Sequence, residues 1–189
     1  MELALPPEWI ADLPTDRPLT ADDVLRLPEG PPHVELIDGE LIVNASPVRP
    51  HARVARNLFL ALNPVCPPHL EVFPTPIDWV LDQHNVFEPD LTVAEREAIG
   101  DGPLRRTAVL VVEVLSPSTR RRDLTVKRAH YERSGVLAYW IVDPHGPRFT
   151  ALERDATGGF TEAGAFDGAG TFTTTIPFPL TLEVGSLLD

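Results

Sequence analysis

Cysteine is almost absent from this chain of 189 residues, and lysine is equally scarce. The single cysteine, Cys66, can form neither an internal disulfide nor a cysteine-rich zinc site, so a reducing compartment is expected. The sequence also lacks any apolar run approaching the roughly 20 residues that a membrane-spanning helix needs, and its N-terminus lacks the basic start of a signal peptide. We therefore expect a soluble, cytoplasmic protein.

Basic charge is in short supply as well. The chain has 28 acidic against 16 basic side chains and a formal net charge of −12, which argues against a general nucleic-acid coating protein or a membrane-surface binder. The charge is uneven, however, because residues 103–133 hold eight basic and three acidic side chains. This segment predicts a small, local and salt-sensitive contact with nucleic acid, or else ordinary solvated helix charges, at Arg120, Arg121, Arg122 and Arg128.

Lys127 is the only lysine in a chain that otherwise uses arginine for its cations. Such an exception indicates either a need for a compact ammonium with a tunable pKa or a surface lysine placed by chance. Asp123, Lys127 and Tyr131 are spaced i, i+4, i+8 and share one face of a predicted helix. That face is either an ordinary salt-bridged surface or one directed at carboxylates of the adjacent strand.

The hydrophobic pattern predicts a mixed α/β fold with a curved central sheet flanked by helices and with extra antiparallel strands. Residues 1–19 are expected to be extended, and residues 20–189 to form a single domain. An unbroken apolar strand, a helix closed by Gly135 and a second apolar strand predict a crossover packed on a sheet. The predicted helices start at Thr20 and cover 51–62 and 121–134, a hairpin turns at Asp38-Gly39, and strands cover 70–73, 77–81, 87–93, 108–115, 137–142 and parts of 148–182.

Two carboxylates are the main candidates for chemistry. Glu113 interrupts the most apolar strand, where a carboxylate is costly unless it is paired, binds a metal or reaches solvent at the sheet end. Asp90 follows Pro89, and a Pro-Asp dipeptide is by itself an ordinary turn. Together, two carboxylates on neighbouring strands predict a site for Mg²⁺ or Mn²⁺.

The ordered series of motifs resembles the Uma-two family of restriction endonucleases, which belongs to the PD-(D/E)xK nuclease superfamily. The resemblance covers roughly residues 20–185 and implies a restriction-endonuclease-like core. It depends on the segments Glu35-Leu-Ile-Asp-Gly-Glu-Leu, His51, Pro89-Asp90, Val112-Glu113-Val-Leu-Ser-Pro-Ser-Thr119, Asp123 with Lys127 and Tyr131, and Gly135-Val-Leu-Ala-Tyr-Trp-Ile-Val-Asp143-Pro.

The resemblance implies a site for metal-assisted hydrolysis of phosphodiester bonds in DNA. Asp90 and Glu113, with the backbone carbonyl of Val114, would hold Mg²⁺ or Mn²⁺. Leu115 occupies the position where the superfamily usually has its lysine, so Lys127 on the following helix is expected to act in its place. A homodimer is expected because cutting two strands with one site per chain favours two-fold symmetry.

Three further residues match family positions with less definite roles. Glu35 is expected near the metal, or else is a surface acid of the hairpin. His51 is expected near a phosphate, or else simply starts a helix. Tyr131 would hydrogen-bond behind the metal ligands or touch the nucleic-acid backbone, or else is a half-buried packing aromatic.

A different class of function stays open at this point. A nuclease-like fold can serve as a noncatalytic nucleic-acid-binding or assembly module, although the presence of both Asp90 and Glu113 favours the enzyme. Serine hydrolysis and zinc chemistry find no matching motif, because the serines lack a nucleophile elbow and the six histidines are scattered.

Overall fold

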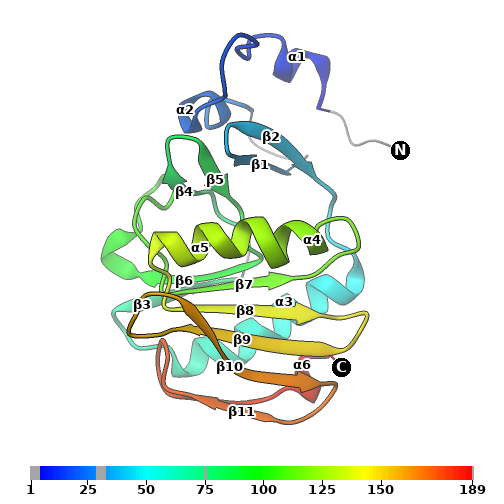
Figure 1. Cartoon of the computed structure of the whole chain (residues 1–189), viewed down its shortest axis with the longest axis vertical. Coiled ribbons are helices and arrows are strands. Elements are labelled where there is room, and N and C mark those ends of the chain that lie inside the picture. Colours follow the sequence, from blue (N-terminus) through cyan, green and yellow to red (C-terminus); the bar gives the residue numbers. More distant parts are fainter. Residues whose placement is uncertain (1–4, 29–32, 75, 189) are drawn as a thin grey trace.

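The computed structural model describes residues 5–28, 33–74 and 76–188 and has the expected mixed α/β architecture. A six-stranded sheet forms the body of the molecule, and a four-stranded sheet lies beside it (Figure 1). A two-stranded ribbon, β11 (Thr171–Thr174) with β12 (Leu180–Glu183), follows near the C-terminus. Among the described residues no helix is long and apolar enough to span a membrane.

The six-stranded sheet has its apolar centre at two parallel strands. Its order is β10 (Phe160–Asp167), β9 (Arg148–Arg154), β8 (Ala138–Asp143), β7 (Leu110–Val114), β6 (Leu91–Glu95) and β3 (Leu70–Phe73). Only β7 and β8 pair in parallel within it; the other neighbours are antiparallel. All residues of β7 and β8 are buried, which confirms the two apolar strands predicted around the crossover.

The crossover from β7 to β8 is a helix with an irregular middle. It begins as α4 (Arg120–Arg122), continues as a π-helical segment η3 (Asp123–Lys127) and ends as α5 (Arg128–Ser134). Gly135 closes it with a φ of 90°, a left-handed conformation that glycine adopts without a steric penalty. The helix and its glycine cap were predicted, whereas the π segment was not.

The four-stranded sheet contains the predicted hairpin. Its order is β2 (Glu40–Asn44), β1 (His33–Ile37), β5 (Asn85–Phe87) and β4 (Trp79–Asp82). Asp38 and Gly39 both have positive φ, as a tight turn that follows the twist of a hairpin requires. The short helix α2 (Ala21–Val24) precedes it, with the Thr20 N–H donating to the Asp23 carboxylate as the capping pattern predicts.

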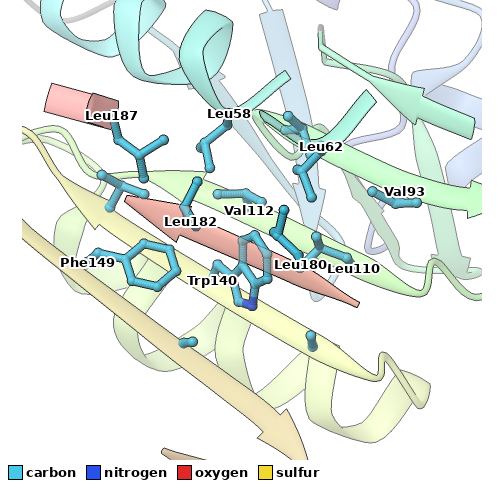
Figure 2. Packing of buried hydrophobic residues seen from close by; sticks show 14 of the residues in the cluster. Leu58, Leu62, Val93, Leu110, Val112, Trp140, Phe149, Leu180, Leu182 and Leu187 are labelled. Carbon is cyan, nitrogen blue, oxygen red and sulfur yellow. The ribbon is translucent and has the colours of Figure 1, made fainter. Parts of the chain in front are cut away.

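Alternation along β7 gives the main sheet two different faces. Leu110, Val112 and Val114 point to the face covered by α3 (Arg49–Leu62), where they join Leu58 and Leu62 in one cluster (Figure 2). The ribbon and α6 (Gly185–Leu188) complete that side. Val111 and Leu115 belong to the other cluster, together with Tyr131 of α5. Glu113 has the same parity as these two residues and therefore faces the crossover helix.

Two predictions for the chain path were wrong in detail. Residues 87–93 do not form one strand: β5 ends at Phe87, β6 begins at Leu91, and the two strands belong to different sheets. Pro89 lies in the gap, where its missing N–H cannot pair in a ladder. The N-terminal segment also holds a short helix, α1 (Pro7–Ile10), where an extended chain was expected; residues 1–4 lie outside the described residues. Two 3₁₀ turns, η1 (Asn63–Val65) and η2 (Arg96–Ala98), complete the elements.

Candidate active site

Seven of the predicted site residues line one pocket of about 520 Å³, namely Glu35, His51, Asp90, Glu113, Val114, Arg122 and Lys127. The pocket lies where the hairpin, the start of α3, the C-terminal end of β7 and the crossover helix meet. Its lining includes five carboxylates, which exceed the three permanently charged cations Arg56, Arg122 and Lys127; the carboxylates are Glu35, Glu88, Asp90, Glu113 and Asp123. This concentration of carboxyl groups in one cavity suits a cation, which their ionised forms can bind.

Lys127 lies at the centre of this charge cluster. Its Nζ is 2.7 Å from Glu35 Oε1 and 2.8 Å from Glu113 Oε1, and the residue is only 3% exposed. Nζ also lies 5.8 Å from the centroid of the Phe87 ring. Burial alone would lower the pKa of Lys127, but the charges of Glu113 and Glu35 outweigh it and raise the pKa above its ordinary value. The side chain is therefore a fixed ammonium.

The two carboxylates that share this ammonium differ in their surroundings. Glu35 is fully buried and accepts hydrogen bonds from Asn44 Nδ2 and the Glu88 N–H, both at 2.9 Å. Burial opposes its ionisation, but Lys127 and these donors still lower its pKa. For Glu113, burial raises the pKa well above the ordinary value, and the nearby acids add to that effect against the pull of Lys127. Glu35 is thus a buried partner of Lys127 and not a surface acid of the hairpin.

Asp90 and His51 form a second pair at the more open side of the pocket. Asp90 Oδ2 accepts a hydrogen bond of 2.7 Å from the Val114 N–H and lies 3.0 Å from His51 Nε2. His51 is in the first turn of α3, and both side chains are about 15% exposed. Burial lowers the pKa of His51, but the contact with Asp90 prevails and raises it. The backbone of Val114 is therefore next to Asp90, while the role of its carbonyl stays a prediction.

Tyr131 is more deeply buried than either alternative predicted from the sequence required. It is not half-buried, because its exposure is 0% and its ring stacks on Trp79 at a centroid distance of 5.7 Å. The hydroxyl donates a hydrogen bond of 2.6 Å to Glu113 Oε1. Contact with a nucleic-acid backbone is excluded by this burial, and Tyr131 instead holds Glu113 from behind.

The arginines of the basic segment separate into two groups. Arg120, Arg121 and Arg128 are exposed on the crossover helix, and Arg120 pairs with Asp143. Arg122 turns into the pocket, where its Nη2 donates to Asn44 Oδ1 at 2.6 Å and lies 3.7 Å from Glu35 Oε2. Of the four predicted contacts, only Arg122 therefore lines the pocket.

Two features of the pocket were missed from the sequence. Glu88 lines it, with its Oε2 3.2 Å from His33 Nδ1; burial, aided by the charges of Asp78 and Glu35, raises the pKa of Glu88 to about 8. Its position directly before Pro89-Asp90 was a possible signal. The second feature is Asn44, which joins Glu35 to Arg122 across the hairpin. Nothing in its sequence context indicated that role.

The donor set suits a hard divalent cation. Among the described residues, no three His, Cys, Asp or Glu side chains already converge as a ligand set. However, Asp123 Oδ1 is buried without a hydrogen-bond partner, in a pocket that Asp90 and Glu113 also line. That oxygen lies 3.9 Å from Lys127 Nζ. Carboxylate oxygens are ligands that Mg²⁺ and Mn²⁺ prefer, so these residues fit such an ion.

Comparison with known proteins agrees with this geometry. The family model Uma2, described as "Putative restriction endonuclease", matches residues 21–185. A crystal structure described as a putative nuclease belonging to DUF820 from Anabaena variabilis has the same fold, with a TM-score of 0.74 and 21% sequence identity. The similarity covers 90% of this chain and 98% of that one. A search among curated proteins gave no match.

Proposed function

This chain belongs to the Uma2 family, and we propose that it is a divalent-metal-dependent endonuclease that hydrolyses phosphodiester bonds in DNA. The observation that carries the proposal is the buried ammonium of Lys127, held between Glu35 and Glu113 at the bottom of a pocket that Asp90 also lines. Burying an ammonium among carboxylates carries a desolvation cost. Its presence in a pocket therefore supports a functional role, namely stabilising the negative charge that develops on a phosphate in the transition state.

Asp90 and Glu113 are the residues that would hold Mg²⁺ or Mn²⁺, together with the carbonyl of Val114. When bound, such an ion polarises the phosphate and lowers the pKa of a coordinated water. The hydrogen bonds from the Val114 N–H to Asp90 and from Tyr131 to Glu113 fix both carboxylates in place before any ion arrives.

Lys127 acts by electrostatic stabilisation and not as a general base. Its raised pKa keeps the ammonium protonated at neutral pH, so it orients the attacking water and offsets negative charge that develops on the phosphate. Glu35 does not face the reaction directly; it holds the ammonium from the side of the hairpin. His51, next to Asp90 and partly exposed, is placed to donate a proton to a phosphate oxygen or to the leaving group.

One observation favours the alternative of a noncatalytic nucleic-acid-binding or assembly module. Glu113 Oε1 already accepts from Lys127 and Tyr131, and the described residues hold no ready set of three ligands. In that case the charge cluster would serve only to stabilise the fold.

Metal binding and cleavage together distinguish these functions. We expect Mn²⁺ to bind the wild type in calorimetry and to bind at least tenfold more weakly to Asp90→Asn and Glu113→Gln. We also expect wild-type cleavage of labelled DNA to be lost in Lys127→Met/Glu35→Gln, which removes the ammonium and keeps the buried charges balanced. Arg26→Gln, at an exposed arginine outside both the pocket lining and the basic segment, is the matched control. Equal Mn²⁺ affinity in all variants, or no cleavage of single-stranded, duplex and branched DNA, would favour the module.

The expected homodimer stays a prediction, which light scattering of the purified protein tests directly.

A further inference from the structure

The pocket has a second side that is apolar. On α3, the residues Ala52, Ala55 and Phe59 line it at helical spacing, while Val54, Leu58 and Leu62 of the same helix point into the core. Val48, just before the helix, lines the pocket as well and is 56% exposed. Prolines extend this apolar wall, namely Pro47, Pro74, Pro76 and Pro117. A wall of this kind offers nothing to a phosphate, but it suits the face of a nucleobase or a sugar.

The charged groups around Lys127 lie deep in the pocket. The side chains of Glu35, Glu113, Asp123 and Lys127 are between 0% and 4% exposed, so a phosphodiester must enter the pocket to reach them. The volume of about 520 Å³ is within the range of roughly 300–1,000 Å³ that proteins use for small ligands. A base-paired helix keeps its bases stacked inside, so it cannot place a base and a phosphate in one such pocket without extruding a nucleotide.

A hydrogen-bond donor is available between the carboxylates and the opening. Arg122 has a buried Nε without a hydrogen-bond partner, although its Nη2 is held by Asn44. The guanidinium lines the pocket and is 21% exposed, so it can contact an anion there. Arg56, from the α3 side, adds a second exposed cation to the lining. Cations beside an apolar wall match the chemistry of a nucleotide.

We infer that the pocket takes an unpaired nucleotide of a DNA strand, with its base against the apolar wall and its phosphate between Arg122 and the carboxylates. The inference rests on the proposed nuclease function and specifies its substrate: single-stranded DNA, a flap or an extruded nucleotide, in preference to a fully paired duplex. Stacking on an apolar or aromatic wall is tolerant of sequence, so little base specificity is expected.

Binding without metal tests the pocket independently of cleavage. Fluorescence anisotropy in EDTA compares a labelled single-stranded oligonucleotide, the same strand with abasic sites, and the same strand in a duplex. We expect the wild type to bind the intact single strand about tenfold more tightly than either the abasic strand or the duplex, which corresponds to roughly one well-stacked base. Ala52→Glu, which places a charged carboxylate on the apolar wall from an exposed position, should reduce the intact-to-abasic ratio to near one. Leu60→Glu, which adds the same charge on α3 at a position that is 61% exposed and outside the pocket lining, should leave it unchanged.

Cleavage with Mn²⁺ separates this inference from the function on which it rests. Faster cutting of the single strand and of a flap than of the duplex supports both. Cutting of all substrates at one rate, or an equal affinity for intact and abasic strands, overturns the unpaired-nucleotide inference and leaves the nuclease in place. Absence of all cutting, with the intact-to-abasic preference retained, overturns the nuclease and leaves the pocket assignment in place. Circular dichroism of Ala52→Glu checks that it is folded.

Discussion

Replacing Lys127 by methionine removes the ammonium that Glu35 and Glu113 share and keeps an unbranched side chain of similar length. Glu35 is fully buried, so its carboxylate would lose its nearest cation without gaining water and keep only Arg122, 3.7 Å away. Breaking a buried ion pair from one side typically costs about 3–5 kcal/mol. For a chain of this size each kcal/mol lowers the Tm by roughly 2–4 °C, so we expect Lys127→Met to melt about 6–20 °C below the wild type.

A second substitution should restore the stability that Lys127→Met loses, and the size of that loss should depend on pH. Adding Glu35→Gln removes the stranded charge, so the double variant should recover most of the loss and show a favourable coupling energy. In Lys127→Met alone, Glu35 keeps the Asn44 and Glu88 donors but loses the ammonium that lowers its pKa most, and we expect burial, the largest effect, then to raise that pKa above the unfolded value. A carboxyl group with a raised folded pKa contributes stability at low pH that is lost as the pH rises. The deficit should therefore be smaller at pH 5 than at pH 8.

Urea unfolding of the wild type, both single variants and the double variant in EDTA measures these differences. The m-value must stay constant across the set for the free energies of unfolding to be comparable. A double variant as unstable as Lys127→Met, or a deficit that grows toward acid, would refute the view that an unbalanced buried carboxylate is the cause.

Two further predictions concern neighbours of the cluster. In EDTA, Glu88→Gln should weaken the fall in Tm between pH 5 and 8. The reason is that the pKa of Glu88 is raised from 4.5 to about 8, so its ionisation destabilises the folded state as the pH rises. Thermal melts from pH 5 to 9 measure this, and an unchanged slope of Tm against pH would contradict it. Tyr139→Phe should lower the free energy of unfolding by about 1 kcal/mol, because its buried hydroxyl donates a 3.0 Å bond to the Asp123 carbonyl at the start of the π segment. Urea titration measures this, and a neutral result would mean that another donor satisfies the carbonyl.

The fold was predictable wherever one local pattern dominated. The apolar run of β7, the glycine after α5 and the Asp38-Gly39 turn each have a local physical cause, and each lies where it was expected. The boundary between β5 and β6 was missed because both are apolar and short, and only their assignment to two sheets separates them. The π segment was missed because the i, i+4, i+8 spacing predicts a regular helix through it; in the structure the carbonyl of its first residue, Asp123, accepts a hydrogen bond from the Tyr139 hydroxyl.

The candidate site was predictable as a set of residues but not as an arrangement. Glu113 and Lys127 were selected as unusual residues in an unusual context, and Asp90 through its pairing with Glu113 and the family resemblance. The structure brings all three to one pocket. The deep burial of Glu35 and Tyr131 was not predictable, because it depends on how the hairpin packs against the crossover helix. Asn44 was missed for the same reason, since a strand-end asparagine is ordinary until its partners are known.

The link of three residues between β5 and β6 ties the small sheet to the integrity of the site. Glu35 lies in the small sheet and Glu113 in the main sheet. Glu88, whose N–H donates to Glu35, and Asp90 both lie in the link. Proteins unfold locally in cooperative units, and a sheet of short strands is expected to be among the first units to unfold. If it opened alone, Lys127 would lose Glu35 and Asp90 would lose its placement. A partly unfolded chain would therefore be inert toward DNA, so a nuclease built this way would act only when its whole fold is complete.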